Sequence, residues 1–293
     1  MREQIVQLLA CPVCRNSLVF EGKKMHGRLF SGFFKCDHGH MFQVNEEIGL
    51  LKDAKLSADE FEWKVNVADE KRYDEIRWQY DSYLREDQKE ATERMTQRLI
   101  DLVVTSCKQS DNVVLDVATG MGRLVLPLAQ KSPEKMVIIG TDIDEKPLRG
   151  AMNRAKKAET WHKLSLIVTD AKHLSFKDSS LSTISSFFGF DNVPETALAL
   201  RESARVLRTG GHLFLLSLWL KEGSKSMRIA EKHNICQIAS EKRLKETLSD
   251  AGLVLEEVQE IYSAVWPYNP MDLLPVKGDE YSHVIVRVGK QKD

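Results

Sequence analysis

From residue 112 onward, apolar segments alternate with helical ones, and this alternation constrains the fold more than any other feature of the chain. The segment "NVVLDVATGMGRLVLPLAQK" joins a strand, a glycine turn and a helix, and "KMVIIGTDIDEKPLRGAMNRAKKA" repeats strand and helix. Three further strands are expected in "LSLIVTDAKHLSF", "LSTISSFF" and "GHLFLLSLW". Strands that alternate with helices form a parallel sheet covered by helices on both faces. The sequence therefore predicts an α/β fold.

Acidic residues end the first three strands of this predicted sheet. They are Asp116, Asp142 and Asp170, and the first precedes a turn that contains Gly120 and Gly122. Ligands of such sheets bind beyond the carboxyl ends of the strands, and glycines let the backbone approach them closely. An acid just before the turn suits an ammonium or sulfonium cation rather than a pyrophosphate. We expect Asp142 to hold ribose hydroxyls and Asp170 to accept from an adenine amino group.

Three of the five cysteines gather near the N-terminus together with histidines. Cys11 and Cys14 form a Cys-x2-Cys pair, and Cys36 is followed at x3 spacing by His40. Three thiolates and one imidazole suit a tetrahedral Zn²⁺, and four protein ligands make such an ion structural rather than catalytic. His38 is the alternative fourth ligand.

A redox pair is the competing interpretation of these cysteines. It requires a Cys-x-x-Cys ahead of a helix, whereas Pro12 and a strand-like continuation follow Cys11 here. The intervening "SLVFEGKKMHGRLFSGFFKC" predicts a short hairpin that joins the two ligand pairs.

The composition changes along the chain and suggests three regions. Residues 1–51 are expected to form a zinc-ribbon-like module, 52–110 a helical linker or lid, and 111–293 the main α/β domain. The middle region is dense in charged and aromatic residues, and its firmest helix is predicted at about 88–107. Its aromatic side chains either anchor a linker, which we favour, or cap an active site. They are Trp78, Tyr80 and Tyr83.

The overall composition is that of an ordinary globular protein, with 42% hydrophobic and 29% charged residues. A net charge of −1 excludes a general polyanion binder. No apolar run reaches the roughly 18 residues of a membrane span, and no signal peptide is recognisable. An odd number of cysteines without an export signal favours a reducing, cytoplasmic location. The oligomeric state stays open, a homodimer included.

The strand-end motifs resemble those of class I S-adenosylmethionine-dependent methyltransferases. "LDVATGMGR", "GTDID" and "VTDAKHL" are similar to the first three motifs of that family, and "SSFFGFDNVPE" to the fourth. The resemblance covers about 111–290. It implies a Rossmann-like, seven-stranded sheet whose last strand is antiparallel, with "YSHVIVRVG" at 281–289 paired to "LVLEEVQEIYS" at 253–263.

The same resemblance implies a site for S-adenosylmethionine. It assigns the methionine part to the first strand end and the glycine turn, the ribose to the second strand end, and the adenine to the third. The residues concerned are Asp116, Ala118, Gly120, Gly122, Asp142, Ile143, Asp170 and Ala171, with Phe188, Gly189 and Asn192 on the methyl-donor side. Asp191, in "GFDNVP", is the candidate for catalytic contact with the acceptor.

The N-terminal region carries a second resemblance. "LLACPVC" with the later Cys-x3-His pair and "EIGLL" looks like the zinc-bearing N-terminus of ribosomal-RNA guanine-N1 methyltransferases, and also like a small zinc-ribbon activator of methyltransferases. The former pattern supports His40 over His38. The segment 52–95 and "VWPYNPMDLLPVKGDEYS" depart from the guanine enzymes.

Three functions follow from these observations. The first is methylation of a base in structured RNA, docked by the zinc module, and the ten Lys/Arg against four Asp/Glu between Arg201 and Lys245 support it. The alternative is methylation of a small molecule, because "FFGFDNVPE" resembles the quinone C-methyltransferases. The third, a non-catalytic zinc-containing scaffold, is disfavoured by the intact glycine turn and the three acids.

Overall fold

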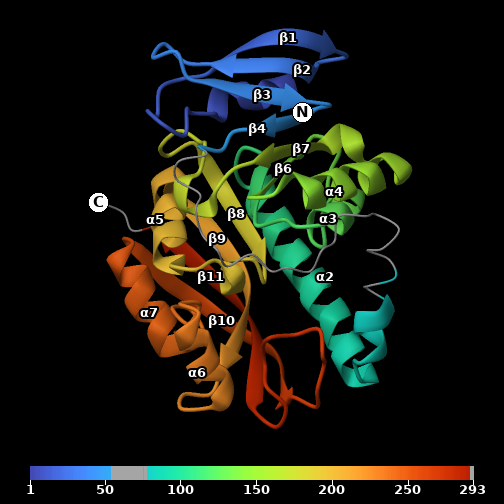
Figure 1. The fold of residues 1–293 in the computed structure, drawn as a ribbon, viewed down its shortest axis with the longest axis vertical. Coiled ribbons are helices and arrows are strands. Elements are labelled where there is room, and N and C mark those ends of the chain that lie inside the picture. The colour runs from blue at the N-terminus through green and yellow to red at the C-terminus, as the bar shows by residue number, and fades with distance from the viewer. Residues whose placement is uncertain (54–74, 76–77, 291–293) are drawn as a thin grey trace.

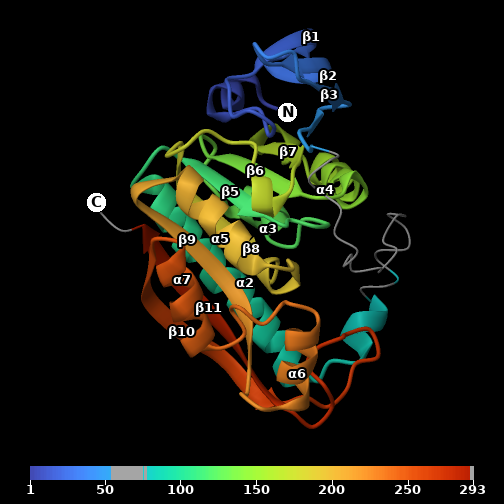
Figure 2. The ribbon, with the colours of Figure 1, turned by 60° about the vertical axis from the view of Figure 1, so that its left-hand side comes forward.

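The computed structural model describes residues 1–53, 75 and 78–290. Its strands are β1 (Val19–Met25), β2 (Arg28–Lys35), β3 (Met41–Asn45), β4 (Ile48–Leu50), β5 (Val113–Val117), β6 (Val137–Asp142), β7 (Leu164–Val168), β8 (Leu181–Phe187), β9 (Leu207–Leu220), β10 (Leu253–Val265) and β11 (Glu280–Lys290). They form an eleven-stranded sheet in the order β1-β2-β3-β4-β7-β6-β5-β8-β9-β11-β10. Figures 1 and 2 show this sheet twisting through the length of the molecule.

Helices cover both faces of the sheet (Figure 2). The α-helices are α2 (Glu86–Lys108), α3 (Val125–Lys131), α4 (Glu145–Lys157), α5 (Thr196–Val206), α6 (Lys225–Lys232) and α7 (Glu241–Asp250). Short 3₁₀ helices are η1 (Glu3–Leu8), η2 (Trp161–Lys163), η3 (Ala171–His173) and η4 (Phe190–Asn192). No helix in the described ranges is both long and apolar enough to cross a membrane.

The two faces have separate cores because successive strand residues point to opposite sides. In β5, Val114 joins the cluster that contains buried residues of α2, α3 and α4. Leu115 and Val117 join the cluster on the other face, with buried residues of α5, α7 and η1. Strands buried on both faces explain the continuous apolar runs in the sequence.

The predicted methyltransferase sheet is confirmed. Strands β7-β6-β5-β8-β9-β11-β10 form its seven members, and β11 runs antiparallel to both β9 and β10. The helix expected at 88–107 is α2, which buries a stripe of residues four positions apart. They are Ala91, Met95, Leu99, Val103 and Cys107.

The N-terminal strands extend this sheet, which the sequence did not indicate. The expected hairpin is formed by β1 and β2, but β4 then pairs in parallel with β7, with Ile48 opposite Leu166. Met1, Ile5 and Leu9 lie in the same hydrophobic cluster as residues of β5 to β9. The boundary at residue 51 stays a prediction, and the two regions share a core across it.

Of the predicted linker or lid, residues 54–74 and 76–77 lie outside the described part of the chain. Residues 78–82 form a helical turn that leads into α2. Trp78 is 76% exposed and Tyr83 is 39% exposed, whereas Tyr80 lies against the α/β domain and donates a hydrogen bond to Asp272.

Candidate active site and cysteine cluster

The glycine turn after β5 is shaped to lie close to a ligand. Ala118, Gly120 and Gly122 all have positive φ, at 55°, 54° and 88°. A Cβ on Gly120 would meet no atom within 4 Å, so the space above that residue is open to a ligand. A Cβ on Gly122 would lie 2.9 Å from Cγ of Leu126, so this position also needs glycine for packing.

Asp116 is placed beneath the turn rather than on it. It is 1% exposed, and its carboxylate accepts hydrogen bonds from Oγ1 of Thr119 at 2.8 Å and Oγ of Ser185 at 2.9 Å. Burial raises the pKa of Asp116 to about 7. Both oxygens are therefore engaged in supporting the loop, and the contact of Asp116 with the methionine part stays a prediction.

Asp142 ends β6 and holds the turn from the other side. Its Oδ2 accepts from the backbone N–H of Gly120 at 2.8 Å, and its Oδ1 accepts from that of Asp144 at 3.1 Å. Burial of the carboxylate raises the pKa of Asp142. The adjacent Ile143 accepts a hydrogen bond from Nζ of Lys52 through its carbonyl at 3.5 Å. Asp142 thus sits between the glycine turn and the expected ribose position.

Asp170 follows β7 and caps η3, which begins at Ala171. Its Oδ1 accepts from the backbone N–H of Lys172 at 2.8 Å. Its Oδ2 is buried and has no hydrogen-bond partner in the described ranges, with Nδ1 of His173 at 3.8 Å. A buried carboxylate oxygen without a donor is costly unless a ligand supplies one. The exocyclic amino group of adenine is such a donor, so the residues present fit an adenosyl group.

The loop after β8 brings the remaining predicted residues together. Phe188 has a positive φ of 56°, and its carbonyl accepts from Nδ2 of Asn192 at 2.7 Å. Gly189 has no room for a side chain, since a Cβ there would lie 2.6 Å from Cβ of Ala118. The β8 loop is therefore packed directly onto the β5 turn, as a ligand spanning both would require.

Asp191, in this loop, presents a buried carboxylate. Its Oδ1 accepts from Oγ of Ser217 at 2.7 Å and from the backbone N–H of Leu218 at 3.1 Å. No described residue gives its buried Oδ2 a hydrogen bond. Burial raises the pKa of Asp191 to about 7, so at neutral pH this carboxyl can take up or release a proton.

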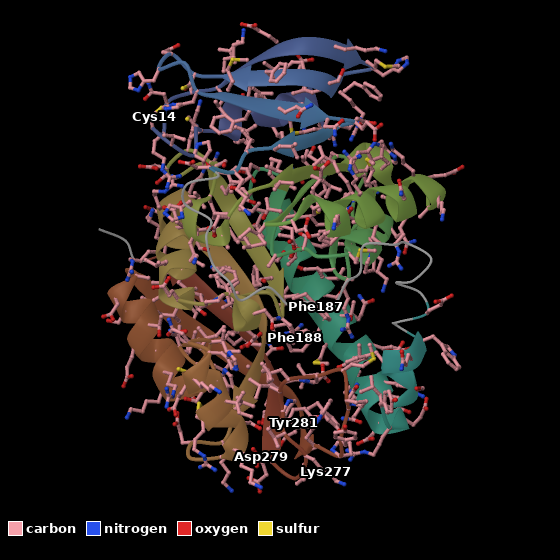
Figure 3. All side chains as sticks on the ribbon, in the orientation of Figure 1. Cys14, Phe187, Phe188, Lys277, Asp279 and Tyr281 are labelled. Atoms are coloured by element: carbon pink, nitrogen blue, oxygen red, sulfur yellow. The ribbon has the colours of Figure 1, made fainter. Side chains whose placement is uncertain are left out.

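A cavity of about 270 Å³ opens beside Asp191, between α2 and the carboxyl ends of β8 and β9. Its walls are largely aromatic and aliphatic, and Figure 3 marks Phe188 and Tyr281. Its aromatic and imidazole walls come from Tyr80, Phe188, Tyr262, Trp266, Tyr281 and His283, and its polar side chains are Gln88, Thr92, Arg123, Asp191, Asn192 and Asp272.

Two wall groups combine burial with a shifted pKa. The ring of His283 lies 5.0 Å from the rings of both Phe188 and Tyr281, and burial lowers its pKa to about 3, so this imidazole is neutral. Tyr80 donates through its hydroxyl to Oδ2 of Asp272 at 3.1 Å, and burial raises the pKa of Asp272 to about 6. The imidazole of His283 is thus an uncharged polar group in the wall of the cavity.

Sequence reasoning missed most of these wall residues. His283 lies in the closing strand "YSHVIVRVG", which carries no site motif, and Trp266 and Asp272 lie in the "VWPYNPMDLLP" segment, which matches no motif. Their only signal was the density of aromatic and proline residues in that segment.

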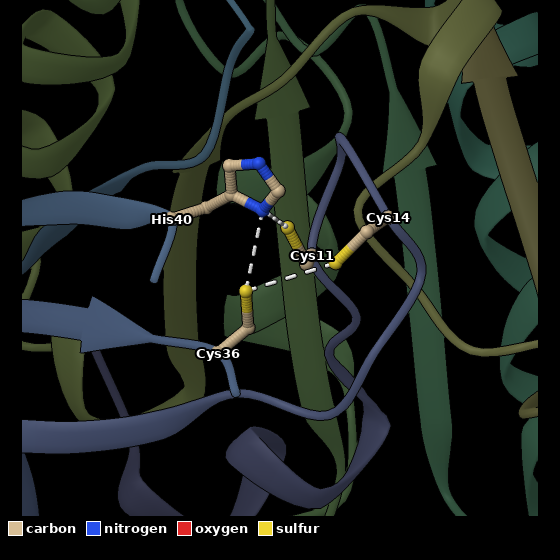
Figure 4. Close-up of side chains that lie close together, drawn as sticks. All are labelled: Cys11, Cys14, Cys36 and His40. Atoms are coloured by element: carbon tan, nitrogen blue, oxygen red, sulfur yellow. Dashed lines mark hydrogen bonds between the residues drawn. The ribbon is translucent and has the colours of Figure 1, made fainter. Parts of the chain in front are cut away.

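The four predicted metal ligands lie close together, as Figure 4 shows. Their ligand atoms all lie within 4.8 Å of one another, and this group comprises Cys11, Cys14, Cys36 and His40. His38 is exposed and is not a member. Sγ of Cys14 lies 3.7 Å from Sγ of Cys36, and Nδ1 of His40 lies 3.6 Å from Sγ of Cys11 and 3.3 Å from that of Cys36.

These spacings fit a tetrahedral zinc site. Zn–S bonds of about 2.3 Å and Zn–N bonds of about 2.0 Å place the ligand atoms of a tetrahedron roughly 3.5–3.8 Å apart. A disulfide would instead require a sulfur–sulfur distance of about 2.0 Å. None of these sulfur atoms is paired in a disulfide, and three thiols with one imidazole match the donor set expected for a structural zinc.

Comparison with known proteins agrees with the site geometry. The sequence model of the ubiE/COQ5 methyltransferase family matches residues 93–230, from α2 to α6. The chain is an S-adenosylmethionine-dependent methyltransferase with the class I fold. The interpretation as a non-catalytic scaffold is therefore wrong.

Individual relatives extend this picture. The methyltransferase is 27% identical over 203 residues to Methyltransferase GfsG of Streptomyces halstedii, covering 65% of this chain and 71% of that protein. It is 38% identical over 106 residues to the demethylmenaquinone methyltransferase of Bacteroides fragilis, covering 36% and 42%. The geranyl diphosphate C-methyltransferase of Streptomyces coelicolor shares the fold, with a TM-score of 0.53, 14% identity and coverage of 68% and 80%.

The methyltransferase spans less than half the length of the demethylmenaquinone enzyme, and the family match begins at residue 93. The cysteine cluster at residues 11–40 therefore lies outside the region matched by that family. The similarity of the N-terminus to ribosomal-RNA guanine-N1 methyltransferases is not reproduced by these comparisons.

Proposed function

We propose that this methyltransferase transfers the methyl group of S-adenosylmethionine to a small, largely apolar, conjugated molecule of the quinone class. The observation that carries the proposal is the cavity of about 270 Å³ beside Phe188, Asp191 and Asn192. Cavities of this kind, mostly apolar with a few convergent polar groups, are typical of small-molecule sites. The volume accommodates a ring system.

The relatives support the same class of acceptor. The family that matches residues 93–230 is named for ubiE and COQ5, and one relative is named a demethylmenaquinone methyltransferase. An acceptor with flat, unsaturated rings would suit the aromatic walls of the cavity, because ring stacking adds to the gain from apolar burial.

The case for an RNA acceptor is weakened by the pairing of basic residues. Of the ten Lys/Arg between Arg201 and Lys245, five form ion pairs with acidic side chains, which offset their charge. These are Arg205, Arg208, Lys221, Arg243 and Lys245. A phosphate-binding surface needs an excess of positive charge that such pairing removes.

The chemistry assigns Asp191 the role of base. Bound S-adenosylmethionine would supply a methyl group already activated on a sulfonium, so the protein mainly positions the acceptor and excludes water. When a ring carbon accepts the methyl group, it must lose its proton. Oδ2 of Asp191 accepts no hydrogen bond from the described residues, and burial raises the pKa of this carboxyl to about 7. Asp191 is therefore suited to receive that proton.

We also propose that Cys11, Cys14, Cys36 and His40 hold one structural zinc ion. The support is the tetrahedral spacing of the four ligand atoms. Such an ion would add folding free energy to the N-terminal strands, which share a hydrophobic core with the main domain.

The proposed function is tested by following a labelled methyl group. The protein is incubated with methyl-labelled S-adenosylmethionine and, in parallel, with demethylated hydroquinones, total lipid extract and total RNA. We expect label in the organic-extractable fraction and none above background in RNA. An Asp191→Asn variant serves as the matched control. Label in RNA that disappears in this variant would overturn the small-molecule assignment.

A further inference from the structure

The cysteine cluster contacts the loop that carries the adenine-binding acid. Leu9, two residues before Cys11, forms an antiparallel bridge with Phe176. The backbone N–H of Ala10 donates to the carbonyl of Ser175 at 3.0 Å, and that of Lys177 donates to the carbonyl of Leu8 at 2.9 Å. The segment that follows η3 is therefore paired directly with the strand-like entry into the first ligand pair.

Arg15 adds a side-chain contact from the turn between Cys11 and Asn16. It follows Cys14 directly, with a positive φ of 63°. Its Nη1 donates to the carbonyl of Leu174 at 2.6 Å, and its Nη2 donates to Oε2 of Glu202 at 3.1 Å. The carbonyl of Leu174 also accepts from Nη2 of Arg205 at 2.9 Å, and Glu202 pairs with both arginines. Arg15 is thus the member of this pair that comes from the cysteine-bearing turn, and its two-ended contact is a geometry that lysine cannot reproduce.

The contacted loop is short and leads back to Asp170. The hydroxyl of Thr169 lies 2.9 Å from that of Ser175, and it donates to the carbonyl of His173 at 3.3 Å. Oγ of Ser175 in turn donates to the carbonyl of Leu51 at 2.7 Å. These bonds close the loop at both ends, so movement of Leu174 and Ser175 is transmitted to Asp170.

The turn that carries Arg15 is held by packing at its start, where Cys11 is buried in the hydrophobic cluster shared with the main domain, whereas Val13 is 43% exposed. Its local backbone bonds run from Cys11 to Asn16 and from Arg15 to Cys11, at 2.8 and 2.9 Å. Its side-chain anchors are the two bonds of Arg15 and the thiols of Cys11 and Cys14, which face Cys36 and His40. A metal bound by these four groups would hold the turn more firmly, and its loss would loosen the position of Arg15.

We propose that the cysteine cluster, acting through Arg15, positions the adenine-binding loop of the methyltransferase, so that metal occupancy sets selectivity for the adenine base. Arg15 is thus a positioning residue, 155 positions away in sequence from the carboxylate that it orients. This inference rests on the proposed zinc and cofactor sites.

The test compares two ligands that differ only along the N1–C6 edge of the purine. S-adenosylhomocysteine carries an amino group at C6 and an acceptor at N1, whereas S-inosylhomocysteine has a carbonyl oxygen at C6 and an N–H at N1. A hydrogen bond to a charged group predicts that the wild-type protein prefers the adenosyl ligand by about tenfold or more in Kd. Isothermal titration calorimetry measures the ratio for the wild type, for Arg15→Ala and for protein stripped of metal by a chelator.

We expect the ratio to fall toward about one in Arg15→Ala and in the metal-free protein, because the loss of one charge-assisted bond removes a preference of this size. Lys35→Ala, which removes an exposed ribbon charge paired with Glu21, is the matched control and should keep the ratio. Zinc added back to the stripped protein should restore it. Because both ligands share every contact outside the N1–C6 edge, general destabilisation would weaken both equally and leave the ratio unchanged, and that result would overturn the inference.

Asp170→Asn distinguishes a failure of the adenine assignment from a failure of the coupling to the cysteine cluster. If this variant keeps the wild-type ratio, the adenine assignment of the proposed site is wrong. If Asp170→Asn loses the ratio while Arg15→Ala and metal removal both keep it, the site stands and the coupling to the cysteine cluster is wrong.

Discussion

The cysteine cluster and the acceptor cavity differ in how far apart in sequence their residues lie. The cluster takes its four ligands from residues 11–40, whereas the cavity walls extend from Tyr80 to His283. Figure 3 shows Cys14 beside the N-terminal strands, apart from Phe188 and Tyr281, which line the cavity. A metal site can be encoded by local spacing, but an acceptor cavity is assembled by the sheet order. The first is therefore visible in a sequence and the second is not.

The largest effect should come from the cysteine cluster. Cys11→Ser removes one of four metal ligands, and structural zinc in small domains contributes about 10 kcal/mol or more to folding. We expect loss of about one zinc per chain, measured by atomic emission, and a lower unfolding temperature, measured by calorimetry. Cys236→Ser, outside the cluster, is the control and should keep its zinc. A wild-type protein purified without zinc would contradict the metal assignment.

The next effect belongs to the cavity. Asp191→Asn keeps the two hydrogen bonds that Oδ1 accepts, but it removes the proposed base. We expect methyl transfer to fall by about 10²–10⁴-fold, the usual contribution of a general base. In the wild type, a base with a pKa of about 7 should make kcat rise with pH through that value.

The unfolding temperature of Asp191→Asn is a second measurement, and it should rise while the activity falls. Between its ordinary pKa of 3.8 and about 7, Asp191 keeps a proton in the folded state that the unfolded chain has lost. The wild type therefore loses stability as pH rises across this window. Asp191→Asn should unfold at a higher temperature than the wild type at pH 8. A variant that is both inactive and less stable would indicate a structural role instead.

A smaller effect is expected at the glycine turn that follows β5. Asp142→Ala removes the carboxylate that accepts from Gly120 and is expected to face the ribose. Two charge-assisted hydrogen bonds correspond to a loss of roughly 10²-fold or more in affinity for S-adenosylhomocysteine. Calorimetric titration measures it, with Asp144→Ala as a control on the same loop. Near-normal affinity would overturn the ribose assignment.

The smallest effect should come from the outer wall of the cavity. Tyr80→Phe keeps the ring but removes the hydroxyl that donates to Asp272. One neutral donor lost next to a carboxylate predicts about a fivefold to tenfold rise in KM for the acceptor, with little change in cofactor affinity. Steady-state kinetics with each substrate varied in turn separate the two. An unchanged KM would place Tyr80 outside the acceptor site.

Much of the fold could be predicted because it rests on local patterns. The strand and helix alternation, the closing antiparallel strand and the helix at 88–107 all follow from periodicity or from motif resemblance. The positions of Asp142 and Asp170 followed from the rule that ligands bind at strand ends. The inward placement of Asp116 could not be predicted, because it depends on hydroxyls from Thr119 and from Ser185 in a distant strand.

The residues around His283 were missed for a related reason. Its register opposite Leu218 places it beside the backbone that holds Asp191, and that register is a property of the β9–β11 pair. No motif marks such a position. The pairing of β4 with β7 was missed because a three-residue strand has no recognisable period.

The pairing of β4 with β7 also decides which strand lies at the open edge of the sheet. All five residues of β7 are buried, and without β4 its backbone N–H and C=O groups would be exposed along one side. The ribbon moves that edge outward to β1, an exposed strand with Glu21, Lys23 and Lys24. Charged edges resist pairing with other chains. The first fifty residues therefore also protect the edge of the methyltransferase sheet from pairing with other chains.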